Sequence, residues 1–300
     1  EPADAGGWLA KMSQAFHSLN YDASFIYVHD GRIETMRVLH AVDQGRERER
    51  LTHLNGPLHE ILRDGETVSR ILPEREDGTL PEAERRRAAI AGLFQVDVDR
   101  LSRYYDFELK GETRVAGRAG LHILVSSKDG YRYGYRLVLD KATGLLLRSD
   151  LTDERGQVIE QIQVVSLALR EQITEAELTP EREAQPMSEA GPELEATTAA
   201  QWRVGWLPEG FNLTRRKQQP TTGSPTEYLM YNDGLTSVSV YIQAGEGSKA
   251  GTEVLRRGGT TVYDLPREGF RVTVIGDVPL VTAQKIADSV RQTGAAATRG

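Results

Sequence analysis

Residues 131–140 read YRYGYRLVLD, and GLLLRSDL follows at 144–151 and QVIEQIQVVSL at 157–167. Apolar and polar residues alternate through the first of these segments, which is the pattern of a β-strand with one buried face. Thr143-Gly144 separates it from the second segment, and a glycine there favours a tight turn. Consecutive short strands joined by turns form an antiparallel meander. This stretch therefore predicts a β-rich fold.

The residues ahead of this meander follow the same plan. Residues 21–28 are aromatic and β-branched, residues 33–42 alternate, and Asp30-Gly31 between them is a strong hairpin signal. Residues 7–19 place apolar side chains at helical spacing. We therefore expect a helix whose single apolar stripe lies against the sheet.

Two charged stretches interrupt the strand signals. Residues 45–51 alternate in charge sign and predict a solvated edge strand. Residues 81–93 read PEAERRRAAIAGL and predict a short helix within an insertion or flap.

The composition changes after residue 170. Residues 171–197 hold eight acidic residues, one basic residue and three prolines but few large apolar residues, which predicts an acidic linker. Strand signals resume after it, and a helical stripe at 279–292 closes the last segment. We therefore expect an α+β protein with a β-rich domain at 1–170 and a smaller α+β domain at 198–300.

Charge and composition exclude several classes of protein. The formal net charge is −7, and the predicted linker carries all of it, so the rest of the chain has no basic field of the kind that nucleic-acid binders need. The chain has no cysteine, which excludes disulfides and cysteine metal sites. No segment approaches the roughly 18 apolar residues of a membrane-spanning helix.

Catalytic motifs are absent from the sequence. None of the six histidines belongs to a His-Glu-x-x-His pair, and there is no Gly-x-Ser-x-Gly elbow and no phosphate-binding loop. A glycan hydrolase would need a facing carboxylate pair, and 44 acidic residues offer no way to choose one. A turn could bring His53 and His59 together, although ordinary core or surface histidines are the commoner reading. The sequence predicts a binding protein, not an enzyme, with no metal and no cofactor.

A strongly curved sheet can leave an apolar concavity that binds a lipid or another apolar ligand. The alternative for each apolar residue on its strands is simple core packing. The candidates for lining such a cavity are Phe25, Tyr27, Met36, Val38, Tyr133 and Tyr135.

The C-terminal domain carries features that suit a protein partner. Two basic clusters could face an acidic or phosphate-rich partner, and solvated faces are the alternative. The strand predicted at 235–243 could accept a peptide strand at an exposed sheet edge. The partner-binding candidates are Arg215, Arg216, Lys217, Val238, Val240, Arg256 and Arg257.

Three segments together resemble one protein family. They are WLAKM at 8–12 leading into YDASFIY at 21–27, WRVGWLPEGF at 202–211, and GLTSVSVYI at 234–242. No single motif is decisive, but their order and spacing are similar to the RseB/MucB family of periplasmic regulators of the envelope-stress sigma factor. The similarity spans nearly the whole chain.

The resemblance implies a fold and a function. The N-terminal domain is expected to be an unclosed antiparallel β-barrel with helices, similar to the carriers LolA and LolB, with a lipid-sensing cavity. The family binds the periplasmic domain of a single-span anti-sigma factor of the MucA/RseA type and shields it from the site-1 protease. Lipid or lipopolysaccharide from a stressed envelope releases that partner, and in the MucB lineage the output is alginate biosynthesis.

The resemblance also implies a location. It favours a periplasmic protein, peripheral to the inner membrane through its partner, with its signal peptide removed and Glu1 near the mature N-terminus. Without it, a start at Glu-Pro-Ala-Asp fits a processed chain and a shortened chain equally. A periplasmic lipid or lipoprotein carrier is the alternative function. The oligomeric state is open, with a homo-oligomer as one alternative.

Overall fold

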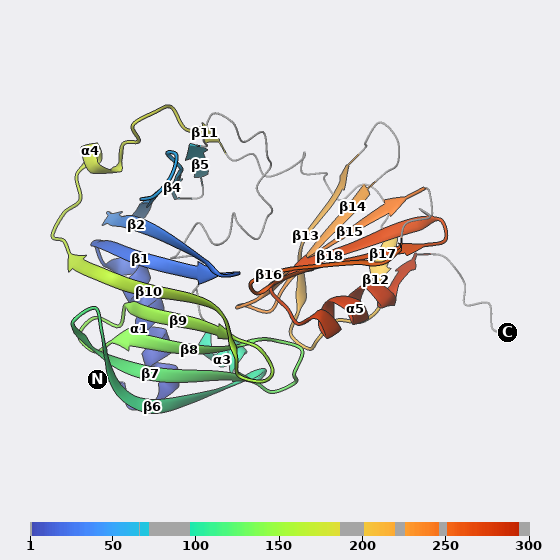
Figure 1. Cartoon of the computed structure of the whole chain (residues 1–300), viewed down its shortest axis with the longest axis horizontal. Helices are drawn as coiled ribbons and strands as arrows, with labels where there is room; N and C mark the ends of the chain where they lie inside the picture. Colours follow the sequence, from blue (N-terminus) through green and yellow to red (C-terminus); the bar gives the residue numbers. More distant parts are fainter. Residues whose placement is uncertain are drawn as a thin grey trace. The chain divides into compact units, whose positions relative to one another are not determined.

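The computed structural model of the chain describes residues 2–65, 67–71, 97–186, 201–219, 226–245 and 251–293. They form two compact units (Figure 1). Unit 1 comprises Glu1–Lys128 and Gly134–Met187, and unit 2 comprises Asp129–Tyr133 and Ser188–Gly300. The helix predicted at 81–93 lies outside the described residues.

Unit 1 is built on one antiparallel sheet in the order β11-β5-β4-β3-β2-β1-β10-β9-β8-β7-β6. Sequence neighbours pair as hairpins, and β1 meets β10 in the middle. The edge strand predicted at 45–51 is wrong, because β3 is paired on both sides, by β2 and β4. Among the described strands β11 and β6 do not pair, so the sheet stays unclosed, which confirms the predicted fold class. The strands are β1 (Tyr21–His29), β2 (Arg32–Asp43), β3 (Arg46–His53), β4 (Glu60–Asp64), β5 (Thr67–Ile71), β6 (Tyr105–Val115), β7 (Arg118–Ser127), β8 (Gly134–Asp140), β9 (Leu146–Thr152), β10 (Val158–Leu169) and β11 (Gln185–Pro186).

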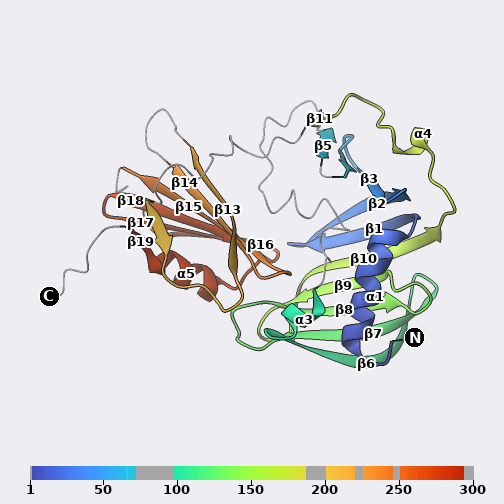
Figure 2. The same cartoon turned by 180° about the vertical axis from the view of Figure 1, so that it is seen from behind.

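Helix α1 (Ala5–Ser18) covers one face of this sheet, and Figure 2 shows it lying across the strands between β6 and β1. Asp4 caps the helix by accepting a hydrogen bond from the Gly7 amide at 2.8 Å. The apolar stripe expected from the sequence is buried against the sheet and consists of Ala5, Trp8, Leu9, Met12, Ala15 and Phe16.

The turn between β8 and β9 fits closely against α1. Gly144 has φ +87, and a Cβ added there would lie 2.8 Å from Lys11 Cγ. The Lys11 ammonium donates to the carbonyl oxygen of Lys141 in the same turn, at 3.1 Å. The Thr143-Gly144 turn signal therefore marks a position where glycine meets both a conformational and a packing requirement.

The first part of the predicted linker packs on unit 1. In this part, α4 (Glu175–Leu178) follows β10 and begins with a capping box made by Thr174 and Glu177. The other short helix of unit 1, α3 (Val98–Leu101), precedes β6 and lies outside the linker. Ile173 and Leu178 are buried against the outer face of β2, which carries Leu39 and Ala41. Few large apolar residues are needed there because one strand supplies the other half of the cluster.

Unit 2 is a six-stranded antiparallel sheet in the order β13-β14-β15-β18-β17-β16, with a separate β12-β19 pair. Helix α5 (Leu280–Ser289) buries Ile286 and Ala287 in the core of the unit, as expected for a small sheet with a C-terminal helix. The strands are β12 (Trp202–Val204), β13 (Asn212–Gln219), β14 (Thr226–Asn232), β15 (Ser237–Ala244), β16 (Glu253–Arg257), β17 (Thr260–Arg267), β18 (Phe270–Gly276) and β19 (Val290–Gln292).

Candidate functional site

Four of the predicted cavity residues lie on one face of the unit 1 sheet. Phe25 on β1 is directly opposite Met36 on β2, and the next pair along the same face is Ala23 with Val38. Tyr27 belongs to this face as well, and all four candidates are buried. Their face is the one that α1 covers, because the ring of Phe16 contacts Tyr21 of β1 edge to face.

The two remaining cavity candidates are separated. Tyr135 is half-buried on β8, opposite Val125 and Leu151. Tyr133 belongs to unit 2, where it is 1% exposed and accepts a hydrogen bond from Arg256 at 3.5 Å. The strand that the sequence predicted from residue 131 begins at Gly134 instead, because residues 129–133 pack as part of unit 2.

A histidine cluster lies on the same unit 1 face, at the end where the turn joins β1 to β2. Glu34 lies 2.9 Å from His29 Nε2 and 3.7 Å from His53 Nδ1. The turn after β3 brings His59 onto His53, with stacked rings 4.3 Å apart. Burial lowers the pKa of both stacked histidines, and the charge of His53 helps to bring the pKa of His59 to about 4. The described part of the chain has no group of three or more ligand residues arranged to hold a metal ion.

A second polar cluster lies at the other end of this face. Glu47 lies 2.7 Å from His17 of α1, 2.9 Å from Arg63 and 3.8 Å from His40. Burial works to raise the pKa of Glu47, but the hydrogen bonds from His17 and Arg63 outweigh it and lower the pKa. Burial lowers the pKa of His40 and raises that of Tyr21, which stacks on it. The cluster fastens the end of α1 to β3 and β4.

The basic cluster on β13 does not form one patch. Because side chains alternate along a strand, Arg216 points to the opposite face from Arg215 and Lys217. Arg216 reaches the buried Glu227 at 3.4 Å, and Lys217 is buried. Burial raises the pKa of Glu227, although the charge of Arg216 partly offsets this.

The second basic cluster lies at the other edge of the unit 2 sheet. Arg256 and Arg257 are exposed on the edge strand β16, whereas Arg215 and Arg216 lie on β13 at the opposite edge. The two clusters therefore cannot act as a single basic surface.

The two valines proposed to bind a partner are core residues. Val238 and Val240 are 0% exposed and pack with Ile286 of α5. Their strand, β15, is paired on both sides, by β14 and β18, so it offers no free edge to a peptide. Both residues are corrected from partner-binding to core positions.

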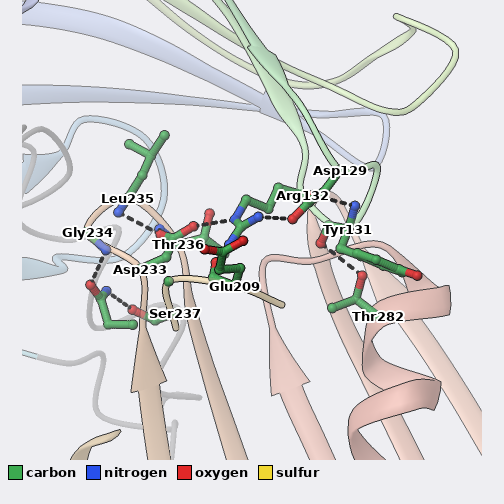
Figure 3. A network of polar contacts seen from close by, with 12 residues as sticks. Asp129, Tyr131, Arg132, Glu209, Asp233, Gly234, Leu235, Thr236, Ser237 and Thr282 are labelled. Atoms are coloured by element: carbon green, nitrogen blue, oxygen red, sulfur yellow. Dashed lines mark hydrogen bonds and ion pairs between the residues drawn. The ribbon is translucent and has the colours of Figure 1, made fainter. Parts of the chain in front are cut away.

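Unit 2 contains an arginine site that no sequence pattern indicated (Figure 3). Arg132 Nε donates to Asp233 Oδ2 at 2.7 Å, and both side chains are 0% exposed. The guanidinium also donates to Asp129 and to the carbonyl oxygen of Glu209, and its Cζ lies 5.1 Å from the centre of the Phe211 ring. Carboxylate, carbonyl and ring face together are well suited to a planar cation.

The β14–β15 turn holds Asp233 in place for this contact. Its Oδ1 accepts hydrogen bonds from the amides of Leu235 at 2.9 Å and Thr236 at 2.7 Å, which leaves Oδ2 directed at Arg132. Asn232 accepts from the Gly234 amide at 2.6 Å, and Gly234 has φ +106. Asn-Asp-Gly is a common turn sequence, but nothing local shows that its aspartate meets a residue 101 positions away.

Tyr131 is held by a second set of contacts in the same unit. Its carbonyl oxygen accepts from Thr282 at 2.9 Å, and its hydroxyl lies 2.6 Å from Lys285 Nζ. The Tyr131 and Trp206 rings meet edge to face at 5.0 Å, and the Lys285 ammonium lies over both. A hydrogen bond from Thr282, the Trp206 ring and the Lys285 ammonium thus hold Tyr131.

Domain models of one protein family match both parts of the chain. The MucB/RseB N-terminal domain model covers residues 4–182, and the MucB/RseB C-terminal domain model covers residues 196–291. The chain therefore belongs to the MucB/RseB family.

Individual members of this family are similar along most of their length. "Sigma factor AlgU regulatory protein MucB" of Pseudomonas aeruginosa is 36% identical over 99% of this chain and 93% of that protein. "Sigma-E factor regulatory protein RseB" of Escherichia coli K12 is 32% identical over 96% of this chain and 90% of that protein. Both names describe regulatory proteins.

Solved structures of MucB with MucA share the fold. A crystal structure of MucB in complex with MucA(peri) has a TM-score of 0.80 at 32% identity, covering 97% of this chain and 100% of that one. The MucA/MucB complex of Pseudomonas aeruginosa gives 0.82 at 33% identity, with coverage of 98% and 100%. Within the described residues, no helix combines the length and apolar character needed to cross a bilayer.

Proposed function

We propose that this chain is a periplasmic negative regulator, not an enzyme. It binds the periplasmic domain of a MucA/RseA-like transmembrane anti-sigma factor and keeps that domain from the site-1 protease. One observation carries the proposal, namely the likeness along 97% or more of the chain to MucB solved with MucA. Fold alone does not imply function, but here both domains match in the same order in proteins named as sigma-factor regulators.

The second half of the proposal is that lipid or lipopolysaccharide releases the partner. A ligand shifts a binding equilibrium only by its differential affinity for two states, so lipid must prefer a state that binds the partner poorly. Phe25, Met36 and Val38 support a lipid site because they gather on one face under α1. Because these side chains are buried, an acyl chain that enters this face must displace packed side chains, which couples lipid entry to a change in unit 1.

The test is a calorimetric titration of the full chain with the periplasmic segment of a MucA-like anti-sigma factor, with and without lipopolysaccharide. We expect a dissociation constant below about 1 μM, on the scale of a standard interface, and at least tenfold weaker binding with lipopolysaccharide. Absence of binding overturns the regulator. An affinity that lipopolysaccharide leaves unchanged overturns the sensing half.

Two substitutions on β2 locate the lipid site. Val38→Phe places a larger side chain on the buried apolar face, so it should remove the lipopolysaccharide effect while partner binding persists. Overpacking costs typically 1–3 kcal/mol, so a thermal melt must accompany it. Ile33→Phe is the matched control, because Ile33 is 67% exposed on the same strand.

The alternative function, a lipid or lipoprotein carrier, predicts transfer of a lipidated cargo to an acceptor regardless of the anti-sigma segment. Transfer assays therefore separate the two functions. Deleting residues 198–300 is a poorer test, because it removes the partners of Asp129–Tyr133 as well.

A further inference from the structure

The arginine site of unit 2 is more elaborate than a stabilising ion pair requires. Replacing a buried ion pair by apolar residues is often neutral or favourable, so such a pair is weak evidence for a role in stability. Here Asp233 is oriented by two backbone amides, and Glu209 and Phe211 complete the surroundings of the guanidinium. These features select for an arginine side chain, and selecting one side chain is what a recognition site does.

Unit 2 supplies the site from residues that follow the linker, and Asp129–Tyr133 fills it as a separate piece of chain. The site has three positions. Tyr131 lies against Trp206 and Lys285, Arg132 enters the central position, and Tyr133 is buried beside Arg256. The filling segment therefore behaves as a short peptide ligand whose central arginine is flanked by aromatic residues.

The central position requires a cation. Asp233 has no exposed surface, so a side chain without charge at this position leaves the carboxylate without the guanidinium that now faces it. Arginine fits better than lysine, because its planar fork reaches the Asp233 carboxylate and the Glu209 carbonyl oxygen at once while its face lies over Phe211.

We propose that unit 2 carries a recognition site for a protein segment with an arginine between two aromatic residues, and that Asp129–Tyr133 is its intramolecular ligand. A tethered ligand of this kind acts at an effective concentration on the order of millimolar. A partner segment of the same chemistry therefore enters only when it binds more tightly or when the internal segment is withdrawn. All contacts that carry this inference lie within unit 2, and none depends on the anti-sigma proposal.

The test uses the full chain and a fluorescein-labelled peptide of residues 127–134, SKDGYRYG. Fluorescence anisotropy compares the natural chain with a double variant, Tyr131→Ser with Arg132→Ser, which weakens the internal ligand. We expect the double variant to bind the peptide at least tenfold more tightly than the natural chain does. The same peptide carrying Arg132→Gln should bind the variant at least tenfold more weakly.

The double variant loses buried contacts, so its folding is checked during the titration by near-ultraviolet circular dichroism. Trp8→Phe is introduced in every chain, so that the tryptophan signal comes from Trp202 and Trp206 of unit 2. If the variant is unfolded, the peptide should restore the native signal, because binding and folding are then coupled. Equal binding to both chains, equal binding of the Gln peptide, or no binding and no restored signal at 1 mM peptide, on the order of the effective concentration, each overturns the proposal.

Discussion

Arg132→Met tests how the buried arginine contributes to unit 2. The substitution removes one partner of an ion pair in which both side chains are 0% exposed, and such a change typically costs about 3–5 kcal/mol. Asp233→Asn in the same chain removes the buried charge that Arg132 faced but keeps Oδ1 as acceptor for the two turn amides. The double variant should lose only about 1–3 kcal/mol, because the carbonyl oxygen of Glu209 loses its donor and the partly exposed Asp129 loses its ion pair.

Urea unfolding followed by tryptophan fluorescence measures these losses, because Trp202 and Trp206 report on unit 2. Trp8 reports on unit 1, so its contribution is removed with Trp8→Phe in every chain compared. A cost below about 1 kcal/mol for Arg132→Met, or a larger loss when Asp233→Asn is added, would mean that the pair is not charge-coupled.

Three further predictions concern other parts of the chain. The folded pKa of His59 is about 4, lowered by burial and by His53, so the unfolded state binds more protons between about pH 6.5 and 4. The stability of unit 1 should therefore be full above this range and fall as pH falls through it, and His59→Gln should flatten the decline in urea midpoints. Gly144→Ala should cost about 1–3 kcal/mol in thermal unfolding, because Gly144 has a positive φ and contacts α1. The cost should exceed that of Gly31→Ala, because Gly31 has a positive φ but no neighbour within 4 Å. Arg256→Glu should weaken binding of an anti-sigma segment more at 50 mM salt than at 500 mM, and an equal loss at both would exclude an electrostatic role.

Local patterns were enough to predict most of the hairpins. The Asp30-Gly31 and Thr143-Gly144 turns, the alternation along β2 and the helical stripe of α1 all depend on residues close together in the sequence. The approach of His53 to His59 belongs to the same class, because one turn separates them.

The errors arise where the outcome depends on distant segments. The strand β15 reads like any half-exposed strand, and only its pairing with β18 places it inside the sheet. Residues 131–133 continue the apolar–polar alternation of β8 in the sequence. In the structure they do not belong to that strand, and they contact Asp233 and Lys285 instead. The division of the β13 basic cluster between two faces, in contrast, follows from strand geometry and was predictable.

The membership of Asp129–Tyr133 in unit 2 has a consequence for the order of folding. Arg132 contacts Glu209 and Asp233, which are 77 and 101 residues further along the chain. Tyr131 contacts Lys285, which is 154 residues further along. Contacts with such long sequence separations slow folding, because closing the loop costs entropy before the contact forms. The β7–β8 hairpin can form from neighbouring residues long before its tip is covered. Native packing of that tip should therefore be the last and slowest event in the maturation of the chain.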